Sequence, residues 1–192
     1  MAFSLTAKYA SAVLLLLVLP CHGAAHNITA ILGAHPGLAE FTSLLASTGL
    51  AHDINRRNAP ITALAVDNAG MAPLKARRMP RAAIRRRLSL HVLTDYDGVK
   101  LRSLPPGGSA VASTLFPASS SGAGGNGMVK IVMPGLGLGD EGRARFLPVG
   151  SGPGFWQAAF FVKSVYEEAP RDMSVFQVSA VMSAGGPRKA TH

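Results

Sequence analysis

The segment Ile61–Met71, which reads ITALAVDNAGM, constrains the fold of this chain more than any other part of it. A short, mainly apolar run at Ile61–Val66 ends at Asp67-Asn68, and apolar residues then restart in a different register. This pattern is typical of a buried strand that ends in a turn and leads into a helix. Asp67 or Asn68 is well placed to cap that helix. We therefore expect a fully buried strand followed directly by a helix.

A second informative segment, Leu88–Leu101, reads LSLHVLTDYDGVKL. It carries the apolar end of a predicted helix, 80–90, through a histidine into an acidic turn with one tyrosine. His91 falls on one helical face with Ile84 and Leu88. The spacing predicts a partly buried histidine that bonds a backbone group near the end of the helix.

The rest of the chain places helices first and strands later. Apolar residues at helical spacing run from Ile28 to Leu45, and Thr48-Gly49 closes this stretch. Further strands are predicted at 107–116, 128–133, 143–149, 155–166 and 173–182. This order favours an α+β fold over alternating βαβ units. We expect a single domain over 26–182, followed by a small, polar and basic tail over 183–192 that is predicted to be disordered.

The N-terminal residues 1–25 have the features of a secretory signal peptide. A mixed segment is followed by the apolar run Ala12–Leu19, a proline and several small residues. The run is too short to cross a membrane, which takes about 20 apolar residues. We expect cleavage after Ala25, with Gly23 and Ala24 as rival sites, and therefore a secreted protein.

Secretion limits the chemistry of the remaining chain. The full sequence has one cysteine, Cys21, which lies in the predicted signal peptide and would be removed with it. Disulfides, cysteine nucleophiles and thiolate metal sites are therefore not expected in the secreted protein. Asn27-Ile28-Thr29 is the only N-x-S/T sequon and predicts an N-glycan on Asn27. The alternative is that the sequon stays unused because it lies close to the cleavage site.

A run of seven basic side chains stands out in a chain of formal charge +9. No acidic residue occurs between Gly70 and Thr94. The run comprises Lys75, Arg77, Arg78, Arg81, Arg85, Arg86 and Arg87. A charged, solvated helix face is the usual explanation, and Arg85–Arg87 are expected on the half opposite Ile84 and Leu88. The alternative is an anionic partner that relieves the repulsion, such as an acidic polysaccharide or membrane headgroups. Nucleic acid is not expected, because no aromatic residues interleave the run.

No motif in the chain predicts catalysis. Gly137, Gly139 and Gly142 match G-x-G-x-x-G, but the following segment contains Pro148 and opens no amphipathic helix, which favours a loop. There is no G-x-S-x-G or H-E-x-x-H motif, and the six histidines are scattered. We expect no enzyme activity, no cofactor and no metal site.

The segments Ile61–Met71 and Leu88–Leu101 resemble, in order and separation, the two signature boxes of the fasciclin (FAS1) domain family. The opening HNITAILGAHPGLAEFTSLL at 26–45, MVKIV at 128–132 and the closing stretch at 159–179 also resemble plant members of that family. The resemblance covers about 27–179. It implies an α+β fold in which a β-rich wedge of two sheets is flanked by helices.

In plant fasciclin-like arabinogalactan proteins this domain serves in adhesion and matrix organisation. The resemblance implies a noncatalytic protein of the extracellular matrix, cell wall or outer plasma-membrane face, with glycans or extracellular proteins as partners. It links His91 and Tyr96 with adhesion and places Asp67 and Asn68 in the polar turn of the first box. We expect all four to act on the fold first. The alternative function is electrostatic binding of acidic cell-wall polysaccharide through the Lys75–Arg87 run.

Two features of the plant relatives are absent from this sequence. Residues 179–192 form no apolar tail of the kind exchanged for a GPI anchor. Ala-Pro pairs are scattered rather than clustered. Membrane anchoring and heavy O-glycosylation are therefore not expected.

Overall fold

The computed structural model describes residues 27–57, 59–96, 98–117, 127–135, 143–149, 158–167 and 173–182. Its strands are β1 (Ile61–Val66), β2 (Val92–Thr94), β3 (Ser109–Thr114), β4 (Met128–Val132), β5 (Arg145–Val149), β6 (Ala159–Glu167) and β7 (Met173–Val178). Its helices are α2 (Ile28–Gly33), the 3-10 helix η1 (Pro36–Leu38), α3 (Ala39–Thr48), α4 (Leu50–Asn55), α5 (Asn68–Ala76), α6 (Arg81–Ser89) and α7 (Gly98–Arg102). The predicted signal peptide, the tail and the glycine motif at 137–142 lie outside the described residues.

The strands are hydrogen-bonded in the order of the sequence, and the sheet closes into a barrel. Neighbouring strands run antiparallel, except that β1 and β7 pair in parallel, from Ile61 opposite Met173 to Val66 opposite Val178. The first and last strands thus complete the barrel. The predicted α+β class with flanking helices is confirmed, while the strands expected as two sheets form one continuous closed sheet.

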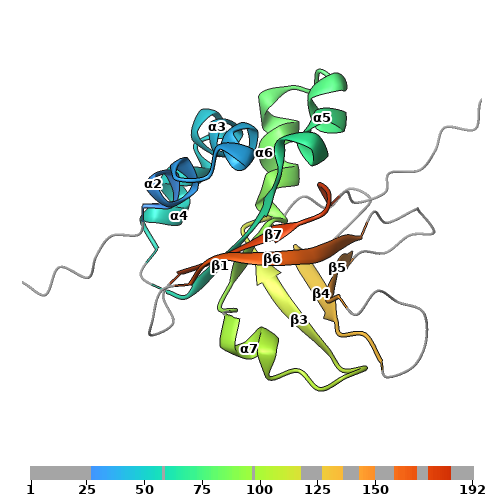
Figure 1. The fold of residues 1–192 in the computed structure, drawn as a ribbon. Coiled ribbons are helices and arrows are strands. Elements are labelled where there is room, and N and C mark those ends of the chain that lie inside the picture. The colour runs from blue at the N-terminus through green and yellow to red at the C-terminus, as the bar shows by residue number, and fades with distance from the viewer. Residues whose placement is uncertain are drawn as a thin grey trace, which may run out of the picture.

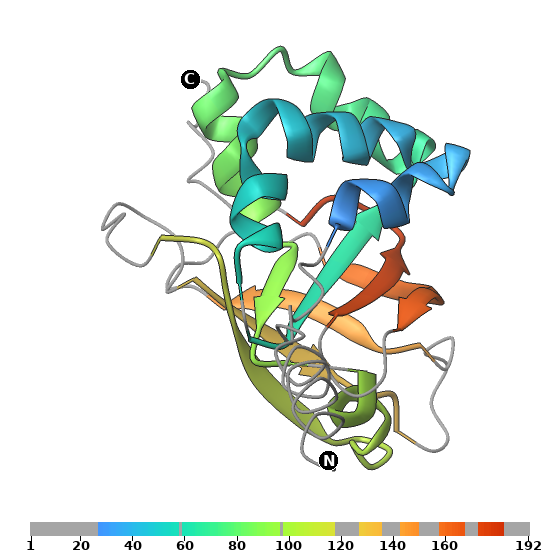
Figure 2. The same cartoon turned by 90° about the vertical axis from the view of Figure 1, so that its left-hand side faces the viewer.

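The helices cover one side of this barrel. Figures 1 and 2 show α2 to α6 gathered above β1 and β7, whereas α7 lies at the opposite end. Every residue of β1 is buried, because the strand has a neighbour on each edge and is covered on both faces. Phe41, Leu45, Ile54 and Leu88 are fully buried in the helical layer. The predicted buried strand is therefore confirmed, and it lies between the helices and the barrel interior.

Longer elements agree with the sequence-based predictions better than short ones. The helix predicted at 80–90 is α6, and the strand predicted at 128–133 is β4. The elements α4, β2 and α7 were not predicted, since three to six residues are too few to show a clear period. Gly49 explains why the first helical stretch stops and restarts. Its φ of 79° ends α3, and α4 begins at the next residue.

Candidate functional site

His91 lies between α6 and β2 and is completely buried. Its Nε2 accepts a hydrogen bond of 2.8 Å from the backbone N–H of Met182. The ring proton is therefore on Nδ1, which donates to the backbone oxygen of Leu64 at 2.8 Å. The ring also makes an edge contact with Phe41 at 6.2 Å between centroids. One imidazole thus joins β1, α3 and the segment that follows β7.

The surroundings of His91 keep it uncharged. Burial lowers its pKa from 6.5 to about 4, although the bond to the Leu64 oxygen acts in the opposite direction. A neutral ring with both nitrogens bonded to backbone has no lone pair or proton left for a substrate. Its chemistry in this fold is structural.

Tyr96 lies four residues after the start of β2 and is 6% exposed. Its backbone oxygen accepts a hydrogen bond from the Thr62 hydroxyl on β1 at 2.5 Å. The backbone oxygen of His91 likewise accepts from the Leu64 N–H, at 2.7 Å. The two sequence segments that carry the family resemblance are therefore bonded directly to each other, with His91 and Tyr96 at the two ends of the contact.

Asp67 and Asn68 have different tasks at the start of α5. Asp67 is the N-cap, because its Oδ1 accepts from the Gly70 N–H at 2.7 Å. Asn68 points to a neighbouring helix, where its side chain bonds the Glu40 N–H at 3.0 Å and the Pro36 oxygen at 3.1 Å. One residue starts the helix, and the next fixes its position against η1 and α3.

Asn27 is the N-cap of α2. Its Oδ1 accepts from the Ala30 N–H at 3.0 Å and from the Thr29 hydroxyl at 2.8 Å. The side-chain nitrogen, to which an N-glycan would be attached, makes no hydrogen bond within the described residues. The residue is exposed, so a glycan on Asn27 stays a prediction with which this geometry is compatible.

Two members of the basic run are neutralised by distant acids. Lys75 forms an ion pair of 2.7 Å with Glu40 on α3. Arg85 forms one of 2.5 Å with Asp53 on α4 and also donates to the Thr48 oxygen at the end of α3, at 2.6 Å. Arg85 was expected on the solvated half of its helix, and its side chain is 41% exposed, but the contacts with Asp53 and Thr48 were not expected. It lies beside the buried residue Ser89 and turns toward α3 and α4.

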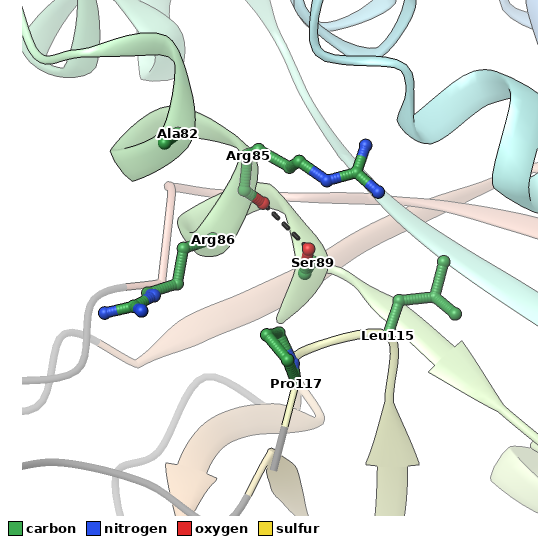
Figure 3. Close-up of a pocket in the computed structure, with 6 residues that line it drawn as sticks. All are labelled: Ala82, Arg85, Arg86, Ser89, Leu115 and Pro117. Carbon is green, nitrogen blue, oxygen red and sulfur yellow. Dashed lines mark hydrogen bonds between the residues drawn. The ribbon is translucent and has the colours of Figure 1, made fainter. Parts of the chain in front are cut away.

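Figure 3 shows how neighbouring arginines of α6 diverge. The side chain of Arg86 extends to the opposite side from Arg85, and its guanidinium lies 6.0 Å from the centroid of the Phe116 ring. Between α6 and the end of β3 is a cavity of about 300 Å³, whose walls include Ser89, Leu115 and Pro117. Of the two arginines that line this cavity, only Arg86 has no carboxylate partner among the described residues.

Two other arginines of the run line a second cavity. Arg77, the C-cap of α5, and Arg87, on α6, both line a space of about 240 Å³ with Ser179 and Val181, which follow β7. Burial lowers the pKa of Arg87, and the positive charge of Arg77 lowers it further. The structure thus brings two like charges to one cavity.

Within the part of the chain that the structure describes, five members of the run have no carboxylate partner. They are Arg77, Arg78, Arg81, Arg86 and Arg87. Their exposure divides them, because Arg87 is half-buried whereas the others are exposed. Among the described residues, the basic run therefore comprises two cations in ion pairs and five arginines without a carboxylate partner.

The residues that complete these contacts were not predicted. Glu40 and Asp53 lie 35 and 32 positions from their basic partners. Ser179 follows β7, the strand that pairs with β1 and closes the barrel. The scarcity of acids was the only sequence signal, since the chain has 10 acidic residues against 19 lysines and arginines.

The described ranges contain no group of three histidine, cysteine or acidic side chains that could hold a metal ion. Over the same ranges, no helix is both long and apolar enough to cross a bilayer.

Comparison of the sequence with known proteins finds several similar plant proteins. No protein-family model matches the chain. Fasciclin-like arabinogalactan protein 2 of Arabidopsis thaliana is 34% identical over 165 residues, which cover 83% of this chain and 38% of that protein. Fasciclin-like arabinogalactan protein 4 of the same organism is 40% identical over 121 residues, or 61% of this chain and 28% of that protein. The chain therefore spans well under half the length of these two relatives.

A solved structure matches the fold. It is a FAS1 domain pair from the insect cell adhesion molecule fasciclin I, with a TM-score of 0.51 and 18% identity. The match covers 77% of this chain and 45% of that one. At this identity the likeness shows the fold alone.

Proposed function

Because the chain is a member of the fasciclin (FAS1) domain family and similar to plant fasciclin-like arabinogalactan proteins, we propose that it is a noncatalytic adhesion module. In this proposal the protein is secreted and acts in the extracellular matrix, in the cell wall or at the outer face of the plasma membrane. It binds a glycan or an extracellular protein through its surface. The solved structure with the same fold comes from a protein called a cell adhesion molecule, and the assignment of adhesion to this chain is part of the proposal.

The site residues support a surface mechanism rather than a reaction. His91 is buried and fully hydrogen-bonded, and Asp67 and Asn68 are used by the fold. These three polar groups are therefore engaged by the fold and are not free to act as an acid, base or nucleophile, which supports the proposal of a noncatalytic module. The motif residues act by shaping the scaffold.

A second candidate function is electrostatic binding of acidic cell-wall polysaccharide. The observation that favours it is the set of five arginines on α6 and in the turn between α5 and α6, which have no carboxylate partner among the described residues. Such a surface attracts polyanions over a distance set by the ionic strength. Adhesion and polyanion binding are compatible functions, and the dependence of binding on salt concentration distinguishes them.

The decisive experiment is binding of residues 26–192, produced by secretion, to an array of neutral and acidic glycans and matrix proteins across a salt titration. Binding to acidic glycans that weakens with salt is expected if the arginines carry recognition. Salt-independent binding would favour a shaped adhesion surface. Absence of binding to every glycan and matrix protein would contradict the adhesion proposal, and shortening of a bound glycan would contradict its noncatalytic character.

A separate measurement tests secretion. N-terminal sequencing of the protein recovered from the culture medium is expected to begin at His26. Recovery only from inside the cells, with residues 1–25 still attached, would contradict the proposed localisation.

A further inference from the structure

We propose that the cavity between α5, α6 and the segment after β7 binds the carboxylate of one acidic sugar residue in a glycan chain. Arg77 and Arg87 are the residues that hold it. The site rests on the glycan recognition proposed above and assigns it to specific atoms.

The charges at this cavity are the first observation. Arg77 and Arg87 line the same space and come from different helices, so the repulsion between them is built in by the tertiary structure. Neither has a carboxylate partner among the described residues. The lowered pKa of Arg87 reflects the same burial and the same neighbour. An oxyanion between the two guanidinium groups would remove this repulsion and bond both forks.

The neutral residues of the cavity fit a sugar. The Ser179 oxygen accepts a hydrogen bond from the Phe160 N–H at 3.0 Å, which leaves its hydroxyl proton available to a ligand. Pro73, Leu74 and Val181 supply apolar wall against which the C–H face of a pyranose ring can pack. The volume of about 240 Å³ lies below the several hundred Å³ of pockets for drug-sized ligands, so it suits one sugar unit rather than an oligomer.

The cavity at Arg86 is the weaker alternative. Both of its lining arginines already have a contact, because Arg85 is paired with Asp53 and Arg86 lies over the Phe116 ring. Two arginines at one cavity fit a carboxylate better than one arginine that is committed to an aromatic ring. Arg78 and Arg81 are exposed and line neither cavity, so they are expected only to attract the polyanion at long range.

The test compares two double variants that each remove two charges. Arg77→Gln/Arg87→Gln changes the cavity, and Arg78→Gln/Arg81→Gln is the matched control on the same run. The probe is an oligomer of galacturonic acid, with the dissociation constant measured by calorimetry at several salt concentrations. We expect the cavity variant to lose about tenfold or more in affinity and the control to lose several-fold less. Equal losses would overturn the site, because diffuse charge would then explain the binding.

Three further arms locate the chemistry. Arg87→Lys keeps the charge but removes the forked guanidinium, so it is expected to weaken binding. It replaces the double variant as the test if thermal unfolding shows that the double variant does not fold. Unchanged affinity of Arg87→Lys would count against the site. The methyl-esterified oligomer is expected not to bind. A sulfated oligosaccharide without carboxylates that binds better than the galacturonate oligomer would overturn the assignment to a carboxylate.

The outcomes separate this site from the function it serves. If the wild-type chain binds neutral glycans or matrix proteins but not the galacturonate oligomer, the cavity assignment is wrong while the adhesion proposal stands. If it binds nothing on the array, the proposed function itself fails.

Discussion

At the residue scale, His91 shows why a residue linked with recognition can be essential without touching a partner. Both of its ring nitrogens bond backbone groups, one on β1 and one in the segment after β7. Losing the ring would leave a buried N–H and a buried C=O without partners, together with a cavity. Any effect of this residue on adhesion is therefore expected to pass through the fold.

Replacing His91 by Ala is expected to lower the free energy of unfolding by about 2–4 kcal/mol, from the cavity and the two unsatisfied backbone groups. Urea unfolding followed by circular dichroism measures this change. His52→Ala is the control, because the His52 side chain is 69% exposed and should cost almost nothing. Normal stability of His91→Ala combined with lost binding would reverse this order and make His91 a recognition residue.

The same residue predicts a pH dependence. His91 has a pKa of about 4 in the folded protein and about 6.5 in the unfolded chain, so the unfolded state binds the proton more tightly. The stabilisation is complete above the unfolded pKa and decreases as the pH falls from about 6.5 toward 4, by on the order of 3 kcal/mol. Urea midpoints measured from pH 7 to pH 4 test this. A His91→Gln variant with the same slope would show that other groups cause it.

At the scale of elements, some of the charged side chains position helices, and only the remaining ones are available for binding. Arg85 connects α6 to α3 and α4, Lys75 connects α5 to α3, and Asn68 connects the start of α5 to η1. The helical layer is thus crossed by polar contacts over its apolar core. The cavity flanked by Arg77 and Arg87 depends on this arrangement, because its two arginines come from the two helices that these contacts position.

Arg85→Gln is expected to lower the free energy of unfolding by about 1 kcal/mol, since the pair with Asp53 is partly exposed and the bond to the Thr48 oxygen is lost as well. Binding of the galacturonate oligomer should change little, because the charge of Arg85 is already neutralised. Arg81→Gln should leave stability unchanged. The comparison needs only thermal unfolding and the binding titration, and a large binding loss in Arg85→Gln with normal stability would contradict it.

At the scale of the whole molecule, the parallel pairing of β1 with β7 closes the barrel and brings the segment that follows β7 to the helical layer. Ser179 and Val181 reach the proposed cavity, and Met182 reaches His91, only because of this closure. A change that separates β7 from β1 should therefore remove the fold and the site together.

Val175→Asp, at a fully buried position of β7, is expected to prevent folding, because an ionised carboxylate would lose its hydration there. Val111→Asp on β3 is the matched control, since Val111 is 56% exposed. The yield of secreted, soluble protein and its near-UV circular dichroism distinguish the two. A soluble Val175→Asp protein with native spectra would show that the closure is less important than the structure indicates.

The sequence by itself determined the elements with a clear local pattern and the family they imply. The buried strand at Ile61–Val66, the helix cap at Asp67 and the strands at 128–132 and 173–178 follow from periodicity and capping chemistry, which act over a few residues. The excess of basic charge was also visible without a structure.

Tertiary structure alone decided which of those charges are free. Glu40 and Asp53 neutralise two of the seven cations across more than thirty residues, and only the folded helices bring them together. The same holds for the meeting of Arg77 with Arg87 and for Ser179 beside them. Helix packing and barrel closure are set by contacts between distant segments, and a local pattern carries no information about which distant side chain will arrive there.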